Sequence, residues 1–163
     1  MDNNALLEEF WQSYSSSLPS GSEQSSRRCE SWHFCDDEQD ANELGALVKA
    51  GVKTATCSLL WVYEAEGARL PEVGGLSIIT DWDGRPLCII ETTEVTIRPF
   101  NEVDSTFAYD EGEGDRSLAY WRKVHWRFFG RELATIGREP TENMPLVCER
   151  FRVVWPKRPL ETQ

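Results

Sequence analysis

The sequence has 163 residues, 40% of them hydrophobic, and it carries a formal net charge of −11. The length fits one domain. The hydrophobic share, with 7 Trp and 7 Phe, is enough for a buried core. This composition excludes a disordered chain, a collagen-like chain and a small disulfide-stabilised fold. The negative charge argues at first against a nucleic-acid-binding protein, because such proteins are usually basic where they neutralise phosphates.

The charge is distributed unevenly along the chain. Residues 1–115 contain 7 basic and 23 acidic side chains, a net charge of −16, whereas residues 116–158 contain 10 basic and 4 acidic side chains, a net charge of +6. Such an asymmetry favours a polyanionic partner. The alternative is a solvated basic helix face that pairs with the acidic half, and the spacing alone favours this alternative.

The sequence predicts a cytoplasmic protein without a membrane partner. Its N-terminus has no basic segment, and Glu8 and Glu9 interrupt the first apolar stretch, which is not typical of a signal peptide. No apolar run approaches the roughly 20 residues of a membrane span. The five cysteines show no C-x-x-C spacing, and Cys29, His33 and Cys35 lack a fourth metal ligand at standard spacing. We therefore expect free thiols, no metal and no cofactor.

The first predicted element is an amphipathic helix over residues 4–17, capped by Asn3 or Asn4. A serine-rich stretch, residues 15–28, is typical of a loop. The predicted organisation is an N-terminal helix and loop over 1–28, a main domain over 29–158, and a tail over 159–163.

The main domain is predicted to be α+β. Asp36 caps a helix over 37–50 that ends at Gly51, and a second helix covers about 117–130, while residues 101–110 form a short helical or looped segment. The predicted strands are 31–34, 53–58, 76–80, 86–97 and 147–155. An Asp-Gly turn at 81–84 joins the third and fourth strands into an antiparallel pair. This order of elements favours a small, partly open β-barrel with inserted helices.

The segment with the clearest chemical potential is Gly51-Val52-Lys53-Thr54-Ala55-Thr56, where a helix ends and a strand begins. A partly desolvated Lys53 at a barrel mouth would have a lowered pKa and act as a base, and Thr56 would be a nucleophile. The two residues are three apart, so a twist or bulge is needed for both to meet one ligand. The alternative is a solvated lysine in an ordinary helix–strand turn.

This segment resembles the G-x-K-x-x-T motif of the ASCH domain family, relatives of the PUA-like RNA-binding β-barrels. Other blocks over residues 30–155 are similar to the longer bacterial members and follow in the same order. These blocks are Ser31-Trp32-His33-Phe34-Cys35, Asp40-Ala41-Asn42-Glu43-Leu44, Ser58-Leu59-Leu60-Trp61, Ile89-Ile90-Glu91-Thr92-Thr93-Glu94-Val95, Glu111-Gly112-Glu113-Gly114-Asp115, Tyr120-Trp121-x-x-x-His125-Trp126 and Cys148-Glu149-Arg150-Phe151. The resemblance implies a small PUA-like, mixed or antiparallel β-barrel with inserted and flanking α-helices.

The resemblance also implies three alternative functions. Some longer bacterial members hydrolyse single-stranded RNA, and some short members remove acetyl from N4-acetylcytidine. For the amidohydrolase, the implied catalytic set is Lys53 as base, Thr56 as nucleophile and Glu111 as acid, with Glu113 or Glu91 as alternatives to Glu111. This chain is much longer than the short amidohydrolases. The third alternative is a non-catalytic RNA-binding module.

We expect a metal-independent ribonuclease whose partner is single-stranded RNA, or else a hydrolase of a modified nucleoside. His125 is a candidate acid, although its place on an apolar helix face also fits a core histidine. Ser58, Trp61, Tyr120, Arg122, His125 and Arg150 are the predicted substrate-binding residues. Further candidates for base stacking are Tyr63, Tyr109 and Trp126, and further candidates for a phosphate-binding rim are Lys123, Arg127 and Arg152. Core packing and a solvated face are the respective alternatives.

Overall fold

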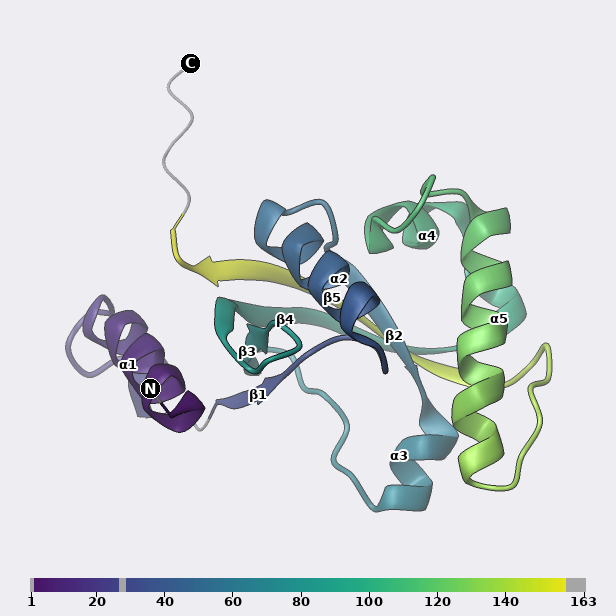
Figure 1. Cartoon of the computed structure of the whole chain (residues 1–163), viewed down its shortest axis with the longest axis horizontal. Coiled ribbons are helices and arrows are strands. Elements are labelled where there is room, and N and C mark those ends of the chain that lie inside the picture. The colour runs from purple at the N-terminus through teal and green to yellow at the C-terminus, as the bar shows by residue number, and fades with distance from the viewer. Residues whose placement is uncertain (1, 27–28, 158–163) are drawn as a thin grey trace. The chain divides into compact units, whose positions relative to one another are not determined.

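The computed structural model describes residues 2–26 and 29–157 (Figure 1). Its elements are α1 (Asn3–Ser16), the 3-10 helix η1 (Glu23–Ser26), β1 (Glu30–Trp32), α2 (Glu38–Ala50), β2 (Ala55–Leu59), α3 (Leu60–Glu66), β3 (Leu76–Thr80), β4 (Pro86–Pro99), the 3-10 helix η2 (Phe100–Glu102), α4 (Ser105–Glu111), α5 (Leu118–Thr135) and β5 (Pro145–Trp155). No helix in this part of the chain is long and apolar enough to cross a bilayer.

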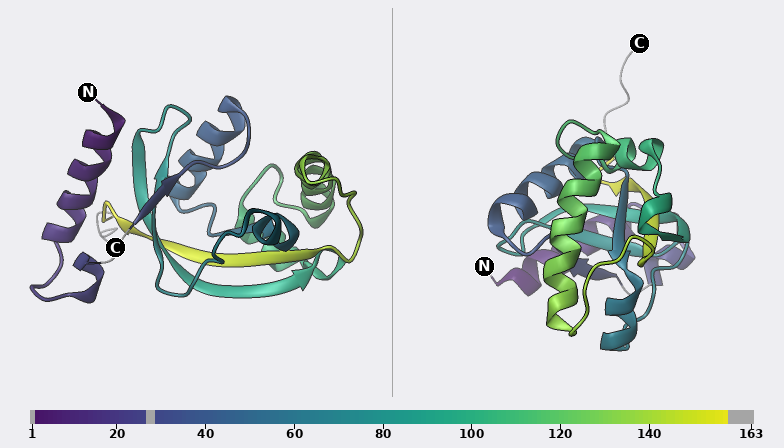
Figure 2. Two further views of the ribbon diagram at one scale, coloured as in Figure 1. Left: turned by 90° about the horizontal axis from the view of Figure 1, so that it is seen from below. Right: turned by 90° about the vertical axis from the view of Figure 1, so that its right-hand side faces the viewer.

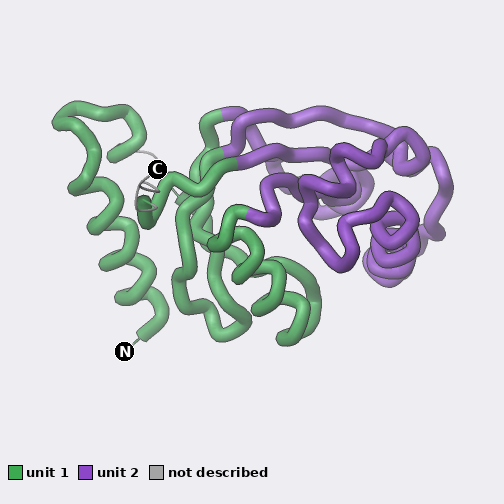
Figure 3. Tube along the Cα trace, turned by 90° about the horizontal axis from the view of Figure 1, so that it is seen from above, with its two compact units in different colours: residues 1–51, 74–91, 152–163 green, residues 52–73, 92–151 purple. Residues whose placement is uncertain are grey.

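The strands follow the order β1-β3-β4-β5-β2, with β1 parallel to β3 and the pairs β3–β4 and β2–β5 antiparallel. The predicted hairpin of the third and fourth strands is thereby confirmed. The chain divides into two compact units (Figure 3): unit 1 is formed by residues 1–51, 74–91 and 152–163, and unit 2 by residues 52–73 and 92–151.

In unit 1 the predicted helices form with small changes at their ends. Asp37, rather than Asp36, caps α2, because its side chain accepts a hydrogen bond from the Asp40 backbone N–H at 2.9 Å. Gly51 ends α2 in the left-handed conformation (φ 73°), as its position predicted. Asp2 caps α1, and Asn3 instead donates its side-chain N–H to the Asp83 carbonyl in the β3–β4 turn.

The core of unit 1 joins α1 to the sheet. Tyr14 from α1 is buried with Leu76 and Ile78 of β3 and Ile89 of β4, and Figure 2 shows α1 beside these strands. The amphipathic face predicted for the N-terminal helix therefore packs on strands of the main domain. The predicted loop over residues 15–28 contains η1, and its last two residues lie outside the described part of the chain.

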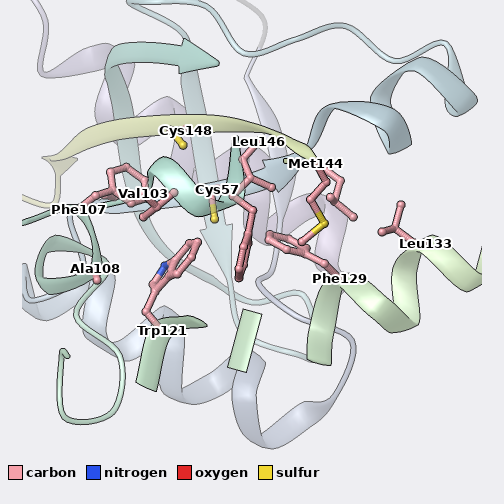
Figure 4. Close-up of a cluster of buried hydrophobic side chains, with 13 residues drawn as sticks. Cys57, Val103, Phe107, Ala108, Trp121, Phe129, Leu133, Met144, Leu146 and Cys148 are labelled. Atoms are coloured by element: carbon pink, nitrogen blue, oxygen red, sulfur yellow. The ribbon is translucent and has the colours of Figure 1, made fainter. Parts of the chain in front are cut away.

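Unit 2 has a larger apolar core between β2, β5, α4 and α5 (Figure 4). Trp121, Phe129 and Leu133 face this core from α5, which continues to Thr135 and is longer than predicted. Cys57 and Cys148 lie directly opposite each other on β2 and β5 and are both buried. The helix α3 was not predicted; its Trp61 and Val62 pack on this core, so tertiary contacts stabilise a turn of helix where the sequence shows only an apolar run.

Candidate functional site

The motif lysine lies in a buried polar cluster inside unit 2, which we call the Lys53 cluster: Lys53, Cys57, Glu111, Glu113 and His125. Backbone contacts between the β2 side and the end of α4 bring these side chains together. The Thr54 N–H donates to the Asp110 carbonyl at 2.8 Å. Gly112 ends α4 at φ 74° and lies against the Val52 carbonyl, where a Cβ atom would be only 2.7 Å from the oxygen.

The Lys53 ammonium group is held by two carboxylates. Its Nζ is 3.1 Å from Glu111 Oε2 and 2.7 Å from Glu113 Oε1. Only 1% of each of the Lys53 and Glu111 side chains is exposed. His125 approaches the same Glu111 oxygen, with its Nε2 at 3.2 Å, while its Nδ1 is 2.9 Å from the Trp121 carbonyl. Both ring nitrogens thus face acceptors, which favours the doubly protonated imidazolium.

The electrostatics of the Lys53 cluster oppose base catalysis by the lysine. Burial by itself lowers the pKa of Lys53, but the charges of Glu111 and Glu113 outweigh it and raise the pKa above its usual value. The expectation of a lowered lysine pKa is therefore wrong, because two buried carboxylates stabilise the ammonium form. Burial by itself would raise the pKa of Glu111 and lower that of His125. The positive charges of Lys53 and His125 instead hold the pKa of Glu111 well below its usual range. The negative charge of Glu111 raises the pKa of His125.

Three side chains of this cluster are potential metal ligands, a possibility that the sequence did not indicate. Cys57, Glu111 and His125 each place a ligand atom within 4.8 Å of the others, and Glu111 Oε1 has no hydrogen-bond partner among the described residues. A metal ion would have to displace protons from a thiol and an imidazole whose pKa values are both raised, and it would compete with the Lys53 ammonium for the carboxylate. The donor set therefore favours the ion pairs over a bound cation.

Thr56 belongs to a different polar group. Burial alternates regularly from Lys53 to Leu59, so Lys53, Ala55 and Cys57 face the core and Thr56 faces the other side of the segment. The twist or bulge that would bring Lys53 and Thr56 to one ligand is absent from this described segment. The structure thus brings Lys53, Glu111 and His125 together and leaves Thr56 apart from them.

Around Thr56 lies what we call the Glu149 cluster: Thr56, Ser58, Tyr63, Thr92 and Glu149. Thr56 and Glu149 are direct cross-strand partners on β2 and β5, and Thr92 Oγ1 donates to Glu149 Oε1 at 3.3 Å. Burial raises the pKa of Glu149, and burial with the charge of Glu149 raises the pKa of Tyr63, which shares a hydrogen bond with Ser58. Glu149 is half-buried and forms no ion pair with any described residue.

The other predicted binding residues are scattered through unit 2. Trp61 lies on α3 with the Arg138 guanidinium 4.5 Å above its ring, and Tyr120 packs against Gly114. Arg150 Nη1 is 2.5 Å from Asp110 Oδ2, and its Nε is 3.8 Å from Glu94 Oε2, so two carboxylates already neutralise this arginine. Arg122 lies on α5 and lines a groove at the surface of this helix.

Glu91, an alternative to Glu111, lies in unit 1 and binds Arg152 at 2.7 Å. Glu113, the other alternative, contacts Lys53 directly. Sequence reasoning missed Glu149, Thr92 and Cys57 as site residues. Pairing the hydroxyl-rich stretch after Lys53 with the last strand would have indicated Glu149, a lone acidic residue in a largely apolar strand.

Comparison with known proteins identifies the fold and the family. The family model of the ASCH domain matches residues 30–155. The structure is similar to the ASCH domain from Lactobacillus crispatus JV V101, with 42% sequence identity over 93% of each chain and a TM-score of 0.84. It is also similar to protein EF3133 from Enterococcus faecalis V583, with 39% identity over 93% of this chain and 89% of that chain and a TM-score of 0.80. The chain belongs to the ASCH domain family.

The expected fold class, α+β and PUA-like, is confirmed by these neighbours. The hypothetical protein PH0355 shares the fold at 15% identity, with a TM-score of 0.50 over 78% of this chain and all of that chain. No protein with a curated description matches the chain. ASCH domains are generally RNA-associated, and this coarser part of the functional expectation applies to the chain as a member of the family.

Proposed function

We propose that this protein is a metal-independent ribonuclease that acts on single-stranded RNA, with its reacting groups in the Glu149 cluster. The observation that carries the proposal is the carboxyl of Glu149, half-buried, without a cationic partner among the described residues, and directly opposite Thr56. A general acid or base works best when its pKa lies near the working pH, and burial moves the pKa of Glu149 in that direction.

The proposed chemistry uses the 2′-hydroxyl of the substrate as nucleophile. The Glu149 carboxylate takes the proton of the 2′-hydroxyl, O2′ attacks the adjacent phosphorus, and the bond from phosphorus to O5′ breaks. The products are a 2′,3′-cyclic phosphate and a 5′-oxygen that takes the proton of the Tyr63 hydroxyl. The Tyr63 hydroxyl carries this proton at neutral pH, and burial and the charge of Glu149 raise its pKa further, which makes it a weaker acid than a free tyrosine. Solvent then returns a proton to Tyr63 and removes one from Glu149.

The Lys53 cluster has a positioning role in this proposal. Lys53 and Glu111 are almost completely buried and form an ion pair with each other, so neither is exposed to a substrate. Their ion pair instead fixes the end of α4 to the residues that lead into β2, the strand that carries Thr56.

Cleavage of a labelled single-stranded RNA in the presence of EDTA tests the proposal. We expect Glu149→Gln to cleave about 100-fold more slowly than the parent, the lower end of what a general acid–base group contributes. Glu139→Gln, at an exposed carboxylate after α5, is the matched control and should cleave like the parent. Absence of cleavage by the parent, or equal rates for Glu149→Gln and the parent, would refute the ribonuclease proposal.

N4-acetylcytidine amidohydrolase is the second candidate, and the direct pairing of Thr56 with Glu149 favours it. Glu149 would take the Thr56 proton, Thr56 Oγ would form a bond to the acetyl carbon, and the carbon–nitrogen bond would break as the amine receives that proton. Water would then release acetate from Thr56. Thr56→Val separates the two functions: it abolishes acetate release in the amidohydrolase, whereas RNA cleavage through the 2′-hydroxyl persists.

A further inference from the structure

A groove of about 590 Å³ lies on the exposed side of α5, apart from both polar clusters. We call it the α5 groove, and its lining residues are Phe100, Arg122, Lys123, Trp126, Arg127 and Glu142. All six belong to unit 2. The volume lies within the range of roughly 300–1,000 Å³ that is typical of small-molecule sites.

The aromatic part of the α5 groove is pre-formed. Trp126 is 37% exposed, although large aromatic side chains are usually buried. Buried Phe100 contacts it in an edge-on arrangement with ring centroids 5.4 Å apart, which limits the orientations of the indole. An exposed, oriented indole is the kind of surface on which a nucleic-acid base stacks.

The groove also has a cationic part, formed by three side chains of α5. Arg122, Lys123 and Arg127 are exposed and form no ion pair with any described residue. Lys123 and Arg127 are four residues apart on one helix, where like charges repel each other. By contrast, several arginines elsewhere are paired with carboxylates, namely Arg69, Arg85, Arg98, Arg150 and Arg152. In a chain with a net charge of −11, three unpaired cations around one groove favour an anionic ligand.

Glu142 narrows the identity of this ligand. Its carboxylate lines the same groove and would repel a bare phosphate or sulfate ion. It would accept hydrogen bonds from a ligand that also carries hydroxyl or amino donors. A nucleotide combines the three required features: a base that stacks, a phosphate, and ribose or base donors.

We propose that the α5 groove binds one nucleotide of a single-stranded RNA, with the base on Trp126 and the phosphate among Arg122, Lys123 and Arg127. The inference rests on the proposed function for the choice of RNA as the ligand. Binding and cleavage are nevertheless measured separately, because a 2′-O-methyl strand has no free 2′-hydroxyl and cannot be cleaved by the proposed route.

Fluorescence polarisation with a labelled 2′-O-methyl pentanucleotide, competed with unlabelled AMP, tests the inference. We expect Trp126→Leu to weaken binding about fivefold or more, from the loss of base stacking. Trp82→Leu is the matched control, because Trp82 is 38% exposed and lies outside the groove. It should bind like the parent.

A salt titration tests the cationic part. Each phosphate contact to a single strand contributes a slope of about −0.7 in log K against log salt concentration, so Arg122→Ala/Arg127→Ala, which removes the arginines that face the one phosphate in the groove, should make the slope shallower by about 0.7. The control pair Arg69→Ala/Arg85→Ala changes the net charge equally and should leave the slope unchanged.

Three outcomes would overturn the inference. These are absence of binding by the parent, equal binding by Trp126→Leu and Trp82→Leu, and equal slopes for the two arginine pairs. Equal affinity for AMP and the pentanucleotide would overturn the assignment to a strand, and equal competition by an acidic peptide would overturn the assignment to a nucleic acid. A parent that binds the strand but never cleaves RNA would refute the ribonuclease proposal and leave this inference standing.

Discussion

Lys53 is stabilised by a neutral set of buried charges. Its ammonium and the His125 imidazolium face Glu111 and Glu113, so two positive and two negative groups balance within unit 2. A buried charge is costly unless it is paired, and removal of one partner leaves the others uncompensated. The network is therefore sensitive to single substitutions through its charge balance alone.

We expect Lys53→Met to lower the free energy of unfolding by about 3–5 kcal/mol, because it leaves Glu111 and Glu113 without their shared cation. The double variant Lys53→Met/Glu111→Gln removes one positive and one negative charge and should recover part of this loss. Urea unfolding of the two variants and the parent measures both effects. A double variant less stable than Lys53→Met would contradict the charge-balance argument.

The raised pKa of His125 predicts a pH-dependent stability. A histidine whose folded pKa lies above its unfolded value, near 6.5, stabilises the fold fully below that value and loses its contribution as the pH rises through the folded pKa. We expect the parent to lose more unfolding free energy than His125→Gln between pH 6 and pH 8. Urea unfolding at the two values measures the difference, and equal losses in both proteins would rule out the ion pair with Glu111 as its source.

At the scale of elements, the contact between the end of α4 and the residues before β2 depends on a glycine. Gly112 and Gly67 end the short helices α4 and α3 in the same left-handed conformation, at φ 74° and 62°. A Cβ atom at Gly112 would lie 2.7 Å from the Val52 carbonyl oxygen, whereas one at Gly67 would meet nothing within 4 Å.

We expect Gly112→Ala to destabilise the protein by clearly more than Gly67→Ala. Both substitutions carry the cost of a left-handed alanine, about 1–2 kcal/mol, and only the first adds a collision with backbone atoms. Thermal or urea unfolding of the two variants compares them directly. If both were equally destabilised, the close approach of Gly112 to Val52 would not contribute to the stability of this region.

Most elements could be predicted from local signals, and the misses have physical causes. Cap residues, Gly51 and the Asp-Gly turn mark α2 and the β3–β4 hairpin within a residue or two. The helix α3 has no side-chain cap and depends on packing against the core of unit 2, which a sequence window does not contain. Because side chains alternate between the two faces of a strand, the three-residue spacing of Lys53 and Thr56 predicted that they face opposite sides unless a twist or bulge intervened.

At the scale of the whole molecule, the site is harder to predict because it depends on pairing between distant segments. The nearness of Lys53 and Glu111 was expected from the family resemblance, and the structure places them in contact. The pairing of Thr56 with Glu149 depends on the register of β2 against β5, which no local pattern sets. The three cations of the α5 groove were visible in the sequence, but the sequence did not show that they form no ion pair with any described carboxylate.

The overall charge also predicts a preference among RNA ligands. A duplex contacts a wide surface, and most of this chain is acidic, whereas a short strand requires only a local cationic site. We expect a 20-base-pair RNA duplex to bind more weakly than a single-stranded pentanucleotide at physiological salt. Polarisation measurements on both ligands check this, and tighter binding of the duplex would contradict a local site.

The balanced charges around Lys53 also constrain how relatives of this protein diverge. A relative in which only the lysine is replaced keeps two buried carboxylates without their shared cation. A relative in which only Glu111 is replaced has an excess of buried positive charge. Tolerated changes should therefore come in compensating pairs. Across ASCH sequences, the positions of Lys53, Glu111, Glu113 and His125 are expected to covary as one unit.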